Sequence, residues 1–429
     1  MTRRAVVTGI GCITPVGNDP ETAWRAVCRG ESGVGPITRF DSTGFPTRIA
    51  AEVRDFDLSR WIDPGRIPTL SQAGRHIHFG LAAAAQAVAD SGIDPTKLSD
   101  PTRFGVYLGS GEGAQNFGTF LGMLADATVP GTECDLTRFS HLGLERLNPE
   151  FEMYQEPNIL ASWVAGLFGA EGPNLNSLTA CAASAQALGE GAEFIRRGVT
   201  DAMIVGGAHS MLHPFGLTGF CLLTTLSTRN DAPQAASRPF DGDRDGFVLG
   251  EGAAMLVLEE YEAAKRRGAK IYGELRGYGA SCDAYRVTDI PEDGNGFARA
   301  IQLSMKEAGL NPEDIGYVNA HGTSTAANDR TETCSLKRAL GERAYKTPMS
   351  STKSMTGHLV AACGALESVF SLLAIRDGIA PPTINQESPD PDCDLDYIPN
   401  KAREVKLDKV MSNNAGFGGQ NVSLILSRV

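Results

Sequence analysis

The stretch Ala89-Asp90-Ser91-Gly92-Ile93-Asp94-Pro95 decides the fold, because Lys306-Glu307-Ala308-Gly309-Leu310-Asn311-Pro312 repeats its pattern about half a chain later. In both copies a glycine ends an apolar helical pattern and a proline follows. An apolar strand pattern then runs into a turn of small residues, Gly109-Ser110-Gly111 in one copy and Ala320-His321-Gly322 in the other. Glycine followed by proline ends many helices. The matching order of helix end, strand and turn nevertheless predicts a duplicated α/β unit.

Further apolar patterns predict alternating strands and helices around this repeat. Helices are expected over 81–90, 182–194 and 297–308, and strands over 6–11, 104–108, 253–258, 271–275, 315–318 and 422–426. The strands over 253–258 and 271–275 flank a basic helix end without a flexible linker. We therefore place the boundary between the halves near 250–272. The halves are expected to be residues 1–260 and 261–429, with one continuous interface between them.

The composition restricts the class of protein. Of 429 residues, 42% are hydrophobic and 21% are charged, which is typical of a globular chain. A net charge of −12 argues against nucleic acid as a partner. The longest nearly apolar stretch, residues 159–170, is too short for a membrane span, which needs about 20 residues. Nine cysteines spread along the chain do not resemble a disulfide framework, so a cytoplasmic location is expected.

A candidate nucleophile precedes the predicted helix over 182–194. Cys181 stands in Leu178-Thr179-Ala180-Cys181-Ala182-Ala183-Ser184-Ala185, directly before an alanine-rich helical pattern. The start of a helix presents unpaired N–H groups and the positive end of the helix dipole, and both favour a thiolate. A buried cysteine without a chemical role is the commoner state. That interpretation is assigned to the other eight cysteines.

Two histidines and a lysine stand among small and hydroxyl-bearing residues. His321 lies in the stretch 319–325, Asn-Ala-His-Gly-Thr-Ser-Thr, and His358 ends Lys353-Ser354-Met355-Thr356-Gly357-His358. A neutral histidine can donate a hydrogen bond to developing negative charge at neutral pH. The alternative for each histidine is a purely structural hydrogen bond. Lys353 follows serine and threonine residues, which is unusual for a solvated lysine.

A glycine-rich turn, Gly416-Phe417-Gly418-Gly419, precedes the last predicted strand. Glycines permit positive φ and can direct a backbone N–H into a cavity, as an oxyanion-binding site requires. The alternative is a plain hairpin turn. A phosphate-binding loop is disfavoured because no Gly-Lys-Ser/Thr follows.

Together these motifs resemble the β-ketoacyl-acyl carrier protein synthases of the elongating kind. The segments that carry the resemblance are 179–184, 226–231, 237–240, 244–249, 319–325, 353–358 and 416–419. The resemblance spans nearly the whole chain and rests on the order cysteine, histidine, lysine, histidine, phenylalanine. It implies a thiolase-like α/β fold, in which two duplicated βαβαβαβ halves form a five-layered αβαβα arrangement, usually as a dimer.

The resemblance also implies the roles of the reacting groups. Cys181 would take an acyl group from a carrier protein as a thioester. His321 and His358 would hydrogen-bond the malonyl thioester carbonyl and stabilise the enolate that forms as carbon dioxide leaves. The backbone N–H groups of Cys181 and Phe417 would form the oxyanion hole, and Phe417 would act as a movable gate. No metal or organic cofactor is implied, because loss of carbon dioxide drives formation of the carbon-carbon bond.

The same resemblance implies supporting residues. Lys353 would orient the second histidine, His358, with Glu367 as its ionic partner. Asp329 and Glu332 would be supporting carboxylates. The side chains of two further residues would bind the phosphopantetheine arm of the carrier protein, and these are Thr323 and Thr325.

Some features of the sequence favour a polyketide pathway and others favour a fatty acid pathway. Leu223-Thr224-Thr225 stands where fatty acid enzymes often carry a docking arginine, and the segment between Gly111 and Cys181 is longer than in those enzymes. These features resemble the ketosynthase subunit of type II polyketide systems, which pairs with a chain length factor. By contrast, Ser351-Thr352-Lys353 and Thr179-Ala180-Cys181 are closer to the fatty acid type. We expect a polyketide or polyene-type ketosynthase with a chain length factor partner; the alternative is a housekeeping fatty acid synthase as a homodimer.

Other classes are less consistent with the sequence. A thiolase would carry a second catalytic cysteine in a Cys-x-Gly turn near the C-terminus, and 416–419 has none. A non-catalytic chain length factor would lack the nucleophile that Cys181 supplies. Histidine pairs that could suggest zinc lack accompanying ligands at suitable spacing; they are His76 with His78, and His209 with His213. Five arginines are equal candidates for docking an acidic carrier protein, namely Arg60, Arg66, Arg75, Arg196 and Arg197.

Overall fold

The same five-strand topology occurs twice in the computed structural model, which describes residues 3–111 and 116–429. The sheet order is β5-β4-β6-β7-β1 in the first half and β10-β9-β13-β14-β8 in the second. Numbered within its own half, each order reads 3-2-4-5-1. In both halves the 3-2 and 2-4 pairs are parallel, whereas the 4-5 and 5-1 pairs are antiparallel. The predicted duplication is therefore confirmed.

The strands of the two halves correspond one to one. They are β1 (Ala5–Ile13), β4 (Phe104–Ser110), β5 (Asn174–Ser177), β6 (Ala202–His209) and β7 (Gly252–Glu260), then β8 (Gly273–Cys282), β9 (Tyr317–Asn319), β10 (Met349–Ser350), β13 (Lys409–Gly416) and β14 (Gln420–Ser427). Each half has one strand more than the predicted βαβαβαβ order, because the short strands β5 and β10 add at the sheet edges. Two small sheets pair β2 (Val34–Pro36) with β3 (Ile49–Ala51) and β11 (Ile379–Ala380) with β12 (Arg403–Glu404).

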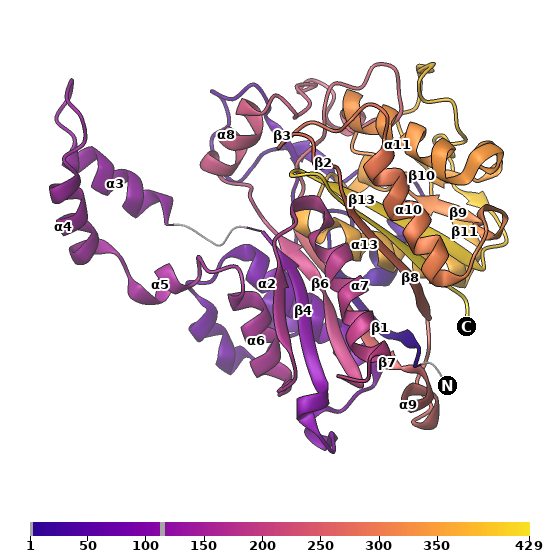
Figure 1. Ribbon diagram of the computed structural model, residues 1–429. Coiled ribbons are helices and arrows are strands. Elements are labelled where there is room, and N and C mark those ends of the chain that lie inside the picture. Colours follow the sequence, from indigo (N-terminus) through magenta and orange to yellow (C-terminus); the bar gives the residue numbers. More distant parts are fainter. Residues whose placement is uncertain (1–2, 112–115) are drawn as a thin grey trace.

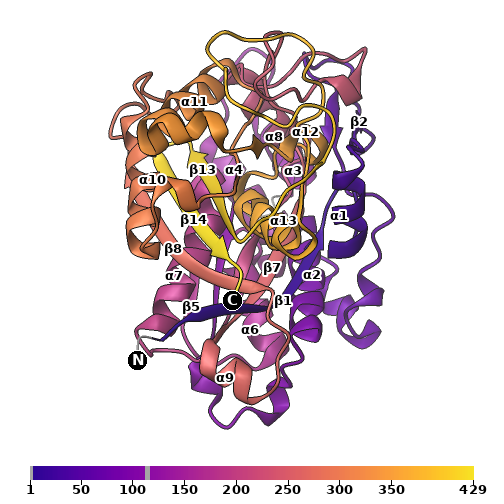
Figure 2. The same cartoon turned by 90° about the vertical axis from the view of Figure 1, so that its right-hand side faces the viewer.

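Five layers stack through the molecule (Figures 1 and 2). Helices α7 (Ala183–Arg196) and α13 (Cys363–Asp377) form the middle layer and contact both halves of the sheet. Helix α2 (Arg75–Ser91) covers the outer face of the first half, and α10 (Asn295–Ala308) with α11 (Ala326–Leu340) covers that of the second. The halves are joined edge to edge by a short antiparallel contact between β1 and β8. The predicted αβαβα arrangement is confirmed.

The repeated helix ends have the geometry that the sequence predicts. Helix α2 ends at Gly92 and α10 ends at Gly309, with φ of 68° and 63°. Glycine takes this left-handed conformation without the steric cost that a Cβ would add. Helix α2 begins earlier than predicted, at Arg75 rather than residue 81, because polar residues in its first turn hide the apolar period.

Glycines in the first strand of each half allow the outer helix to lie close to the sheet. A Cβ at Gly11 of β1 would lie 2.1 Å from the Ala83 carbonyl oxygen of α2. A Cβ at Gly279 of β8 would lie 2.1 Å from the Ala300 carbonyl oxygen of α10. The same glycines weaken the apolar strand pattern, which is why the predicted strand over 271–275 is shorter than β8. Part of the glycine content therefore serves helix-to-sheet packing.

Two strained turns meet at the centre of the molecule. The 3₁₀ turn η5 (Ala180–Ala182) leads into α7, and the turn η9 (Val360–Ala362) leads into α13. Ala180 has φ of 46° and Val360 has φ of 42°, which is unfavourable for residues with a Cβ. Such strain costs roughly 1–3 kcal/mol per residue and persists only where the surrounding structure enforces it. The turns contact each other and bring segments about 180 residues apart in the chain together.

A helical arm extends from the first half (Figure 1). It contains α3 (Phe117–Ala127), α4 (Leu136–Arg146) and α5 (Pro149–Met153), which lie between β4 and β5 in the chain. Helix α6 (Ile159–Phe168) follows and packs against α2 and β4, so the apolar stretch over 159–170 is a core segment, as predicted. No helix in the described part of the chain is long and apolar enough to cross a membrane.

The remaining helices lie at the periphery or near the joints between layers. They are α1 (Pro20–Cys28), α8 (Pro214–Leu222), α9 (Tyr261–Arg266) and α12 (Lys353–Thr356).

The close approach of β1 and α2 leads to a test of the packing. Replacing Gly11 with alanine places its Cβ against backbone atoms of α2, so we expect Gly11→Ala to lower the free energy of unfolding by about 1–3 kcal/mol or more. The control is Gly122→Ala in α3, where the added Cβ meets no atom within 4 Å. Alanine favours a helix over glycine by about 0.5–1 kcal/mol, so this variant is expected to be neutral or stabilised. Denaturant unfolding measures both, and a Gly11→Ala midpoint equal to that of wild type would contradict the packing.

Candidate active site

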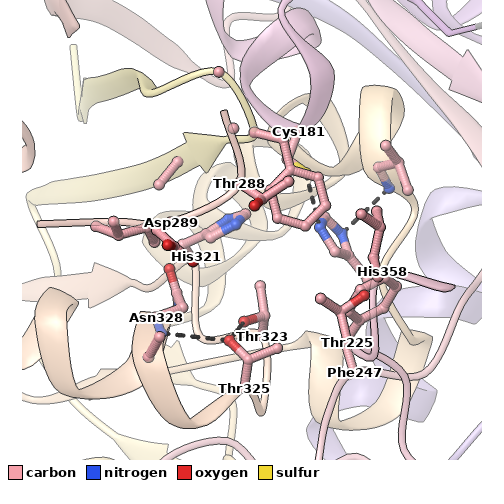
Figure 3. A pocket seen from close by; sticks show the side chains of 18 of the residues that line it. Cys181, Thr225, Phe247, Thr288, Asp289, His321, Thr323, Thr325, Asn328 and His358 are labelled. Atoms are coloured by element: carbon pink, nitrogen blue, oxygen red, sulfur yellow. Dashed lines mark hydrogen bonds between the residues drawn. The ribbon is translucent and has the colours of Figure 1, made fainter. Parts of the chain in front are cut away.

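The predicted nucleophile and both predicted histidines line one cavity of ≈190 Å³. Figure 3 shows Cys181, His321 and His358 directed toward the same space. Cys181 comes from the turn η5 in the first half, whereas both histidines follow second-half elements. All three are buried, and the cysteine is 6% exposed. The site therefore exists only where the two halves meet.

His358 contacts the sulfur of Cys181 through a nitrogen that carries a proton. Its Nε2 lies 3.1 Å from Cys181 Sγ, and its Nδ1 accepts a hydrogen bond from the backbone N–H of Val360 at 3.2 Å. A neutral imidazole has one donor and one acceptor nitrogen. Because Nδ1 is the acceptor, Nε2–H is the donor that points into the cavity. This arrangement suits hydrogen-bond donation to an oxygen atom in the cavity.

His321 is held in the same tautomer by Lys353. The Lys353 ammonium lies 3.3 Å from His321 Nδ1 and donates to the His321 carbonyl oxygen at 2.6 Å. An ammonium has only donors, so Nδ1 is again the acceptor and Nε2 carries the proton. The expectation that Lys353 orients the second histidine, His358, is wrong. Lys353 contacts the first histidine, and a backbone amide orients the second.

Both histidines are neutral near physiological pH. Burial lowers the pKa of His321 and of His358 well below the usual value, because a charged imidazolium would lose its hydration. The positive charge of Lys353 lowers both pKa values further. The cavity thus presents two uncharged N–H donors, which can stabilise developing negative charge.

The environment of Cys181 differs in part from the prediction. Burial raises the pKa of its thiol to about 11, while Lys353 and the backbone amides of Phe417 and of Cys181 itself act to lower it. The Cys181 amide, at the start of the helix, and the Phe417 amide of the hairpin do favour the thiolate, but desolvation of the sulfur outweighs them. The resting side chain is therefore a thiol that must lose its proton as it reacts. The two amides near the sulfur correspond to the expected oxyanion hole, which stays a prediction.

Beneath the histidines lies a buried ion pair. The Lys353 ammonium contacts the Glu367 carboxylate, and both side chains are 2% exposed. Burial disfavours the charged lysine, but Glu367 raises its pKa above the ordinary value. The other carboxylate oxygen, Oε2 of Glu367, accepts a hydrogen bond from Asn414 Nδ2 at 2.7 Å. The expected ionic partnership of Lys353 and Glu367 is present, whereas the contact with Asn414 has no counterpart in the sequence analysis.

The two predicted supporting carboxylates lie under the turn that carries His321. Glu332 accepts hydrogen bonds from the backbone N–H groups of His321 and Gly322, both at 2.8 Å. Burial raises the pKa of Glu332 to about 7, against the effect of these amides. Asp329 accepts from the backbone N–H of Phe240 at 2.8 Å and faces Arg244 at 3.6 Å. Both carboxylates contact the backbone around the cavity and do not line it.

Hydroxyl and amide groups line the approach to the histidines. The hydroxyls of Thr323 and Thr325 lie 2.9 Å apart, and Thr325 also caps the start of α11. Several other residues that line the cavity have no predicted role, namely Thr225, Thr288, Asp289, Asn328, Phe220 and Phe247. Phe247 packs edge-on against both Phe220 and His358. These residues come from separate loops and helices that approach the cavity only in the folded chain, with Phe220 on α8 and Asn328 on α11.

The Gly-rich turn combines two roles that were considered as alternatives. It is a hairpin that connects β13 and β14, and Gly418 and Gly419 have positive φ of 90° and 80°. The same turn lines the cavity and directs the Phe417 amide to Cys181. The hairpin is therefore part of the site.

The three groups around the cavity are also of the types that bind metal ions. Ligand atoms of Cys181, His321 and His358 lie within 4.8 Å of one another. Histidines that bind a metal normally donate their second ring N–H to an acceptor. Here each Nδ1 is itself an acceptor, so the proton occupies the Nε2 that a metal would need. The donor set fits an oxygen atom in the cavity better than a metal ion.

The contact between Lys353 and His321 predicts a change in tautomer. In Lys353→Met the donor to His321 Nδ1 is lost, so His321 should no longer be held as the Nε2–H form. Nitrogen NMR of histidine-labelled protein should then show His321 with a mixed tautomer. His358 is the internal control, because its Nδ1 is held by the Val360 amide and should not change. An unchanged His321 spectrum, or an equal change at His358, would contradict the assigned contacts.

Family models and curated relatives that match this chain all name the same family of enzymes. The model of the β-ketoacyl synthase N-terminal domain matches residues 2–264, and that of the C-terminal domain matches residues 272–387. The 3-oxoacyl-[acyl-carrier-protein] synthase 2 of Coxiella burnetii is 45% identical over 427 residues, which cover 100% of this chain and 99% of that protein. The enzyme of the same name from Synechocystis is 44% identical over 430 residues, with 99% and 98% covered.

Two solved structures are similar to this chain, and each similarity extends over the full length of this chain and of the solved one. A ketosynthase in complex with its type II polyketide acyl carrier protein and bound to a hexaketide is similar with a TM-score of 0.88 and 35% identity. The ishigamide ketosynthase/chain length factor is similar with a TM-score of 0.86 and 34% identity. Each comparison covers 100% of both chains. This chain therefore belongs to the β-ketoacyl synthase family.

Proposed function

We propose that this chain is a β-ketoacyl-acyl carrier protein synthase, an acyltransferase that joins an acyl group to malonyl-acyl carrier protein by decarboxylative Claisen condensation. The observation that carries the proposal is the arrangement around one cavity of a thiol and two neutral Nε2–H donors. Catalysis of this kind needs donors directed to the oxygen on which negative charge develops. The family and the relatives support the same activity.

In the first half-reaction, Cys181 would take the acyl group. Its sulfur attacks the thioester carbonyl of acyl-acyl carrier protein, a new sulfur-carbon bond forms, and the bond to the phosphopantetheine sulfur breaks. The proton of the thiol leaves with the phosphopantetheine thiol. Negative charge on the tetrahedral oxygen would be stabilised by the amides of Cys181 and Phe417, worth about 2.7–4 kcal/mol for each donor. Phe417 would also move to open the site once the cysteine is acylated.

In the second half-reaction, malonyl-acyl carrier protein would bind with its thioester carbonyl between His321 and His358. The bond to the malonyl carboxylate breaks, carbon dioxide leaves, and the electron pair forms an enolate whose oxygen accepts from both Nε2–H groups. The enolate carbon attacks the acyl carbonyl on Cys181, and the cysteine sulfur leaves and takes up one proton. Thr323 and Thr325 would bind the phosphopantetheine arm, because their hydroxyls line the cavity.

The remaining groups would support these steps. Lys353 and Glu367 would keep His321 neutral and oriented, and Asp329 and Glu332 would hold the backbone of the turn that carries it. We propose that residues 1–260 supply the nucleophile and that residues 261–429 supply the two hydrogen-bond donors. No cofactor is needed for this chemistry, since the thioester and the leaving carbon dioxide supply its driving force.

For the pathway we propose a type II polyketide or polyene-type system, in which this chain is the ketosynthase subunit beside a chain length factor. The solved neighbours that work with a carrier protein or a chain length factor support it. A fatty acid elongating homodimer is the second candidate, and the 45% identity to a 3-oxoacyl synthase 2 favours it. A non-catalytic chain-length-factor-like role does not fit a chain with Cys181 in place. Reconstitution with carrier protein and malonyl units, with and without a co-expressed partner lacking the cysteine, distinguishes the two pathways.

The proposed carrier protein is acidic and needs a basic surface. Arg75 forms an ion pair with Glu251 at 2.7 Å, and Arg196 forms one with Glu193 at 2.5 Å. These two arginines therefore have structural roles. Arg60 and Arg197 stay docking candidates. A cytoplasmic location is also proposed, because all nine cysteines are free thiols.

The second subunit would dock on the arm. Exposed large apolar side chains gather on it, namely Phe120, Leu121, Leu124, Val129, Leu136, Leu144, Leu147 and Met153. Contiguous exposed apolar surface marks interaction sites in soluble chains. Two further exposed leucines lie at the sheet edge, Leu175 on β5 and Leu178 directly after it. We propose that the arm and this strand contact the partner subunit.

Acylation of Cys181 provides the direct test of the function. Incubation with acyl-acyl carrier protein should add one acyl group to the intact mass of the wild-type chain, and Cys181→Ala should show none. Cys363→Ala is the control, because that thiol is equally buried but donates to the Cys181 carbonyl oxygen and does not line the cavity. An adduct of unchanged amount in Cys181→Ala would refute the assignment.

The arm leads to a test of assembly. Introducing charge at exposed positions, as in Leu136→Glu with Leu144→Glu, should convert a dimer to a 45.5 kDa monomer in analytical ultracentrifugation. Leu303→Glu on α10 is the control, because Leu303 is also exposed but lies far from the arm in the fold. A dimer that withstands the double substitution would show that the arm is not the subunit interface.

A further inference from the structure

A buried asparagine completes the polar chain that ends at His321. Asn414 is on β13, is fully buried and directs its side chain toward α13. Its Nδ2 donates to Glu367 Oε2 at 2.7 Å and lies 3.5 Å from Cys363 Sγ. Glu367 in turn contacts Lys353 through its other oxygen, and Lys353 contacts His321. One hydrogen-bonded chain thus connects a residue outside the cavity to one of its two donors.

The fold provides space for this amide. Position 364 of α13 is glycine, and a Cβ there would lie 2.6 Å from Asn414 Oδ1. Any larger side chain at 364 would push the amide away from Glu367. The Asn414 Oδ1 atom itself has no hydrogen-bond partner in the described part of the chain. A buried polar atom without a partner costs roughly 1–3 kcal/mol. The Nδ2 atom carries the contacts of this amide, to Glu367 and to Cys363.

We propose that Asn414 is a positioning residue that holds Glu367 ionised and oriented, and thereby keeps Lys353 charged against His321. The inference rests on the proposed function, since it concerns the donor that would stabilise the malonyl enolate. A carboxylate in this buried place is stable only with donors to both oxygens. Lys353 supplies one and Asn414 supplies the other.

The consequences of losing the amide follow in order. Burial raises the pKa of Glu367, and the hydrogen bond from Asn414 lowers it. Without that bond, Glu367 takes up a proton at a higher pH than in wild type. Lys353 then has no counter-charge and tends to lose its own proton in the buried site. Neutral Lys353 no longer enforces the Nε2–H tautomer of His321, so one of the two donors to the enolate is lost.

Other titratable groups face this pair and stay unchanged in the variants. They are Cys363 on α13, Cys181 from η5, Tyr317 on β9, Glu332 on α11 and the two histidines of the cavity. Because none of them is replaced, a shift in the pH profile of an Asn414 variant reports on Glu367 and Lys353. Since activity requires ionised Glu367, the acid limb of the profile must move to higher pH.

The experiment measures malonyl decarboxylation and Cys181 acylation separately in the full-length protein. In Asn414→Leu, the rate of carbon dioxide release from malonyl-acyl carrier protein should fall about tenfold or more at neutral pH, as expected for a lost hydrogen bond to a charged group. The acid limb of its pH profile should move to higher pH. The rate of acyl transfer to Cys181 should change less, because Lys353 contacts His321 directly and acts on Cys181 only through its charge.

Two further variants make the result decisive. Asn414→Asp keeps the shape but places a second carboxylate beside Glu367, so the acid limb should move further upward than in Asn414→Leu. It serves as the test if the leucine variant does not fold. The control is Asn413→Leu on the same strand, which removes an equally buried amide without a bond to Glu367 and should leave the acid limb in place.

The outcomes separate the two hypotheses. If wild type neither acylates Cys181 nor releases carbon dioxide, the proposed function fails. If wild type performs both steps and the Asn414 variants leave the acid limb where it is, the positioning role of Asn414 is overturned. An equal shift in Asn413→Leu would also overturn it, because the effect would then follow from loss of any buried amide.

Discussion

The site depends on the buried ion pair of Lys353 and Glu367. A single charge at this depth would be strongly destabilising, whereas a pair with further hydrogen bonds is tolerated. The pair places a positive charge beside His321 Nδ1, and this charge adds to the effect of burial in keeping both histidines neutral. Burial of the whole cluster increases the effect, because the low-dielectric interior strengthens each electrostatic interaction. The chemistry of the cavity therefore follows from one ion pair and the packing that excludes water from it.

Duplication explains how the cluster is assembled. The turns η5 and η9 occupy equivalent positions in the two halves, and each carries a strained residue, Ala180 or Val360. The first turn presents a cysteine to the cavity, and the second holds His358 through a backbone amide. The halves have thus kept one backbone and diverged in side chains. Because α7 and α13 pack against each other in the middle layer, the two turns cannot separate without disrupting the core.

Burial determines the resting protonation state of each reacting group. Desolvation raises the pKa of Cys181 and lowers the pKa of both histidines, so these three groups are uncharged in the resting site. Charge appears only when the thioester reacts, and the donors are already in position for it. Such preorganised donors require no reorganisation at the moment of reaction. The arm, by contrast, lies outside this core and presents apolar side chains to solvent, as a surface for association would.

The sequence by itself determined the duplicated unit and the helix ends at Gly92 and Gly309, and its family resemblance predicted Cys181, His321 and His358 as the groups of one site. Local signals encode the repeat and the helix ends, because caps and turns depend on neighbouring residues. Only the tertiary structure decided that Lys353 contacts His321 rather than His358, that burial raises the pKa of Cys181, and that Asn414 supports Glu367. These relations depend on depth and on distances between residues from different layers, which no local pattern records.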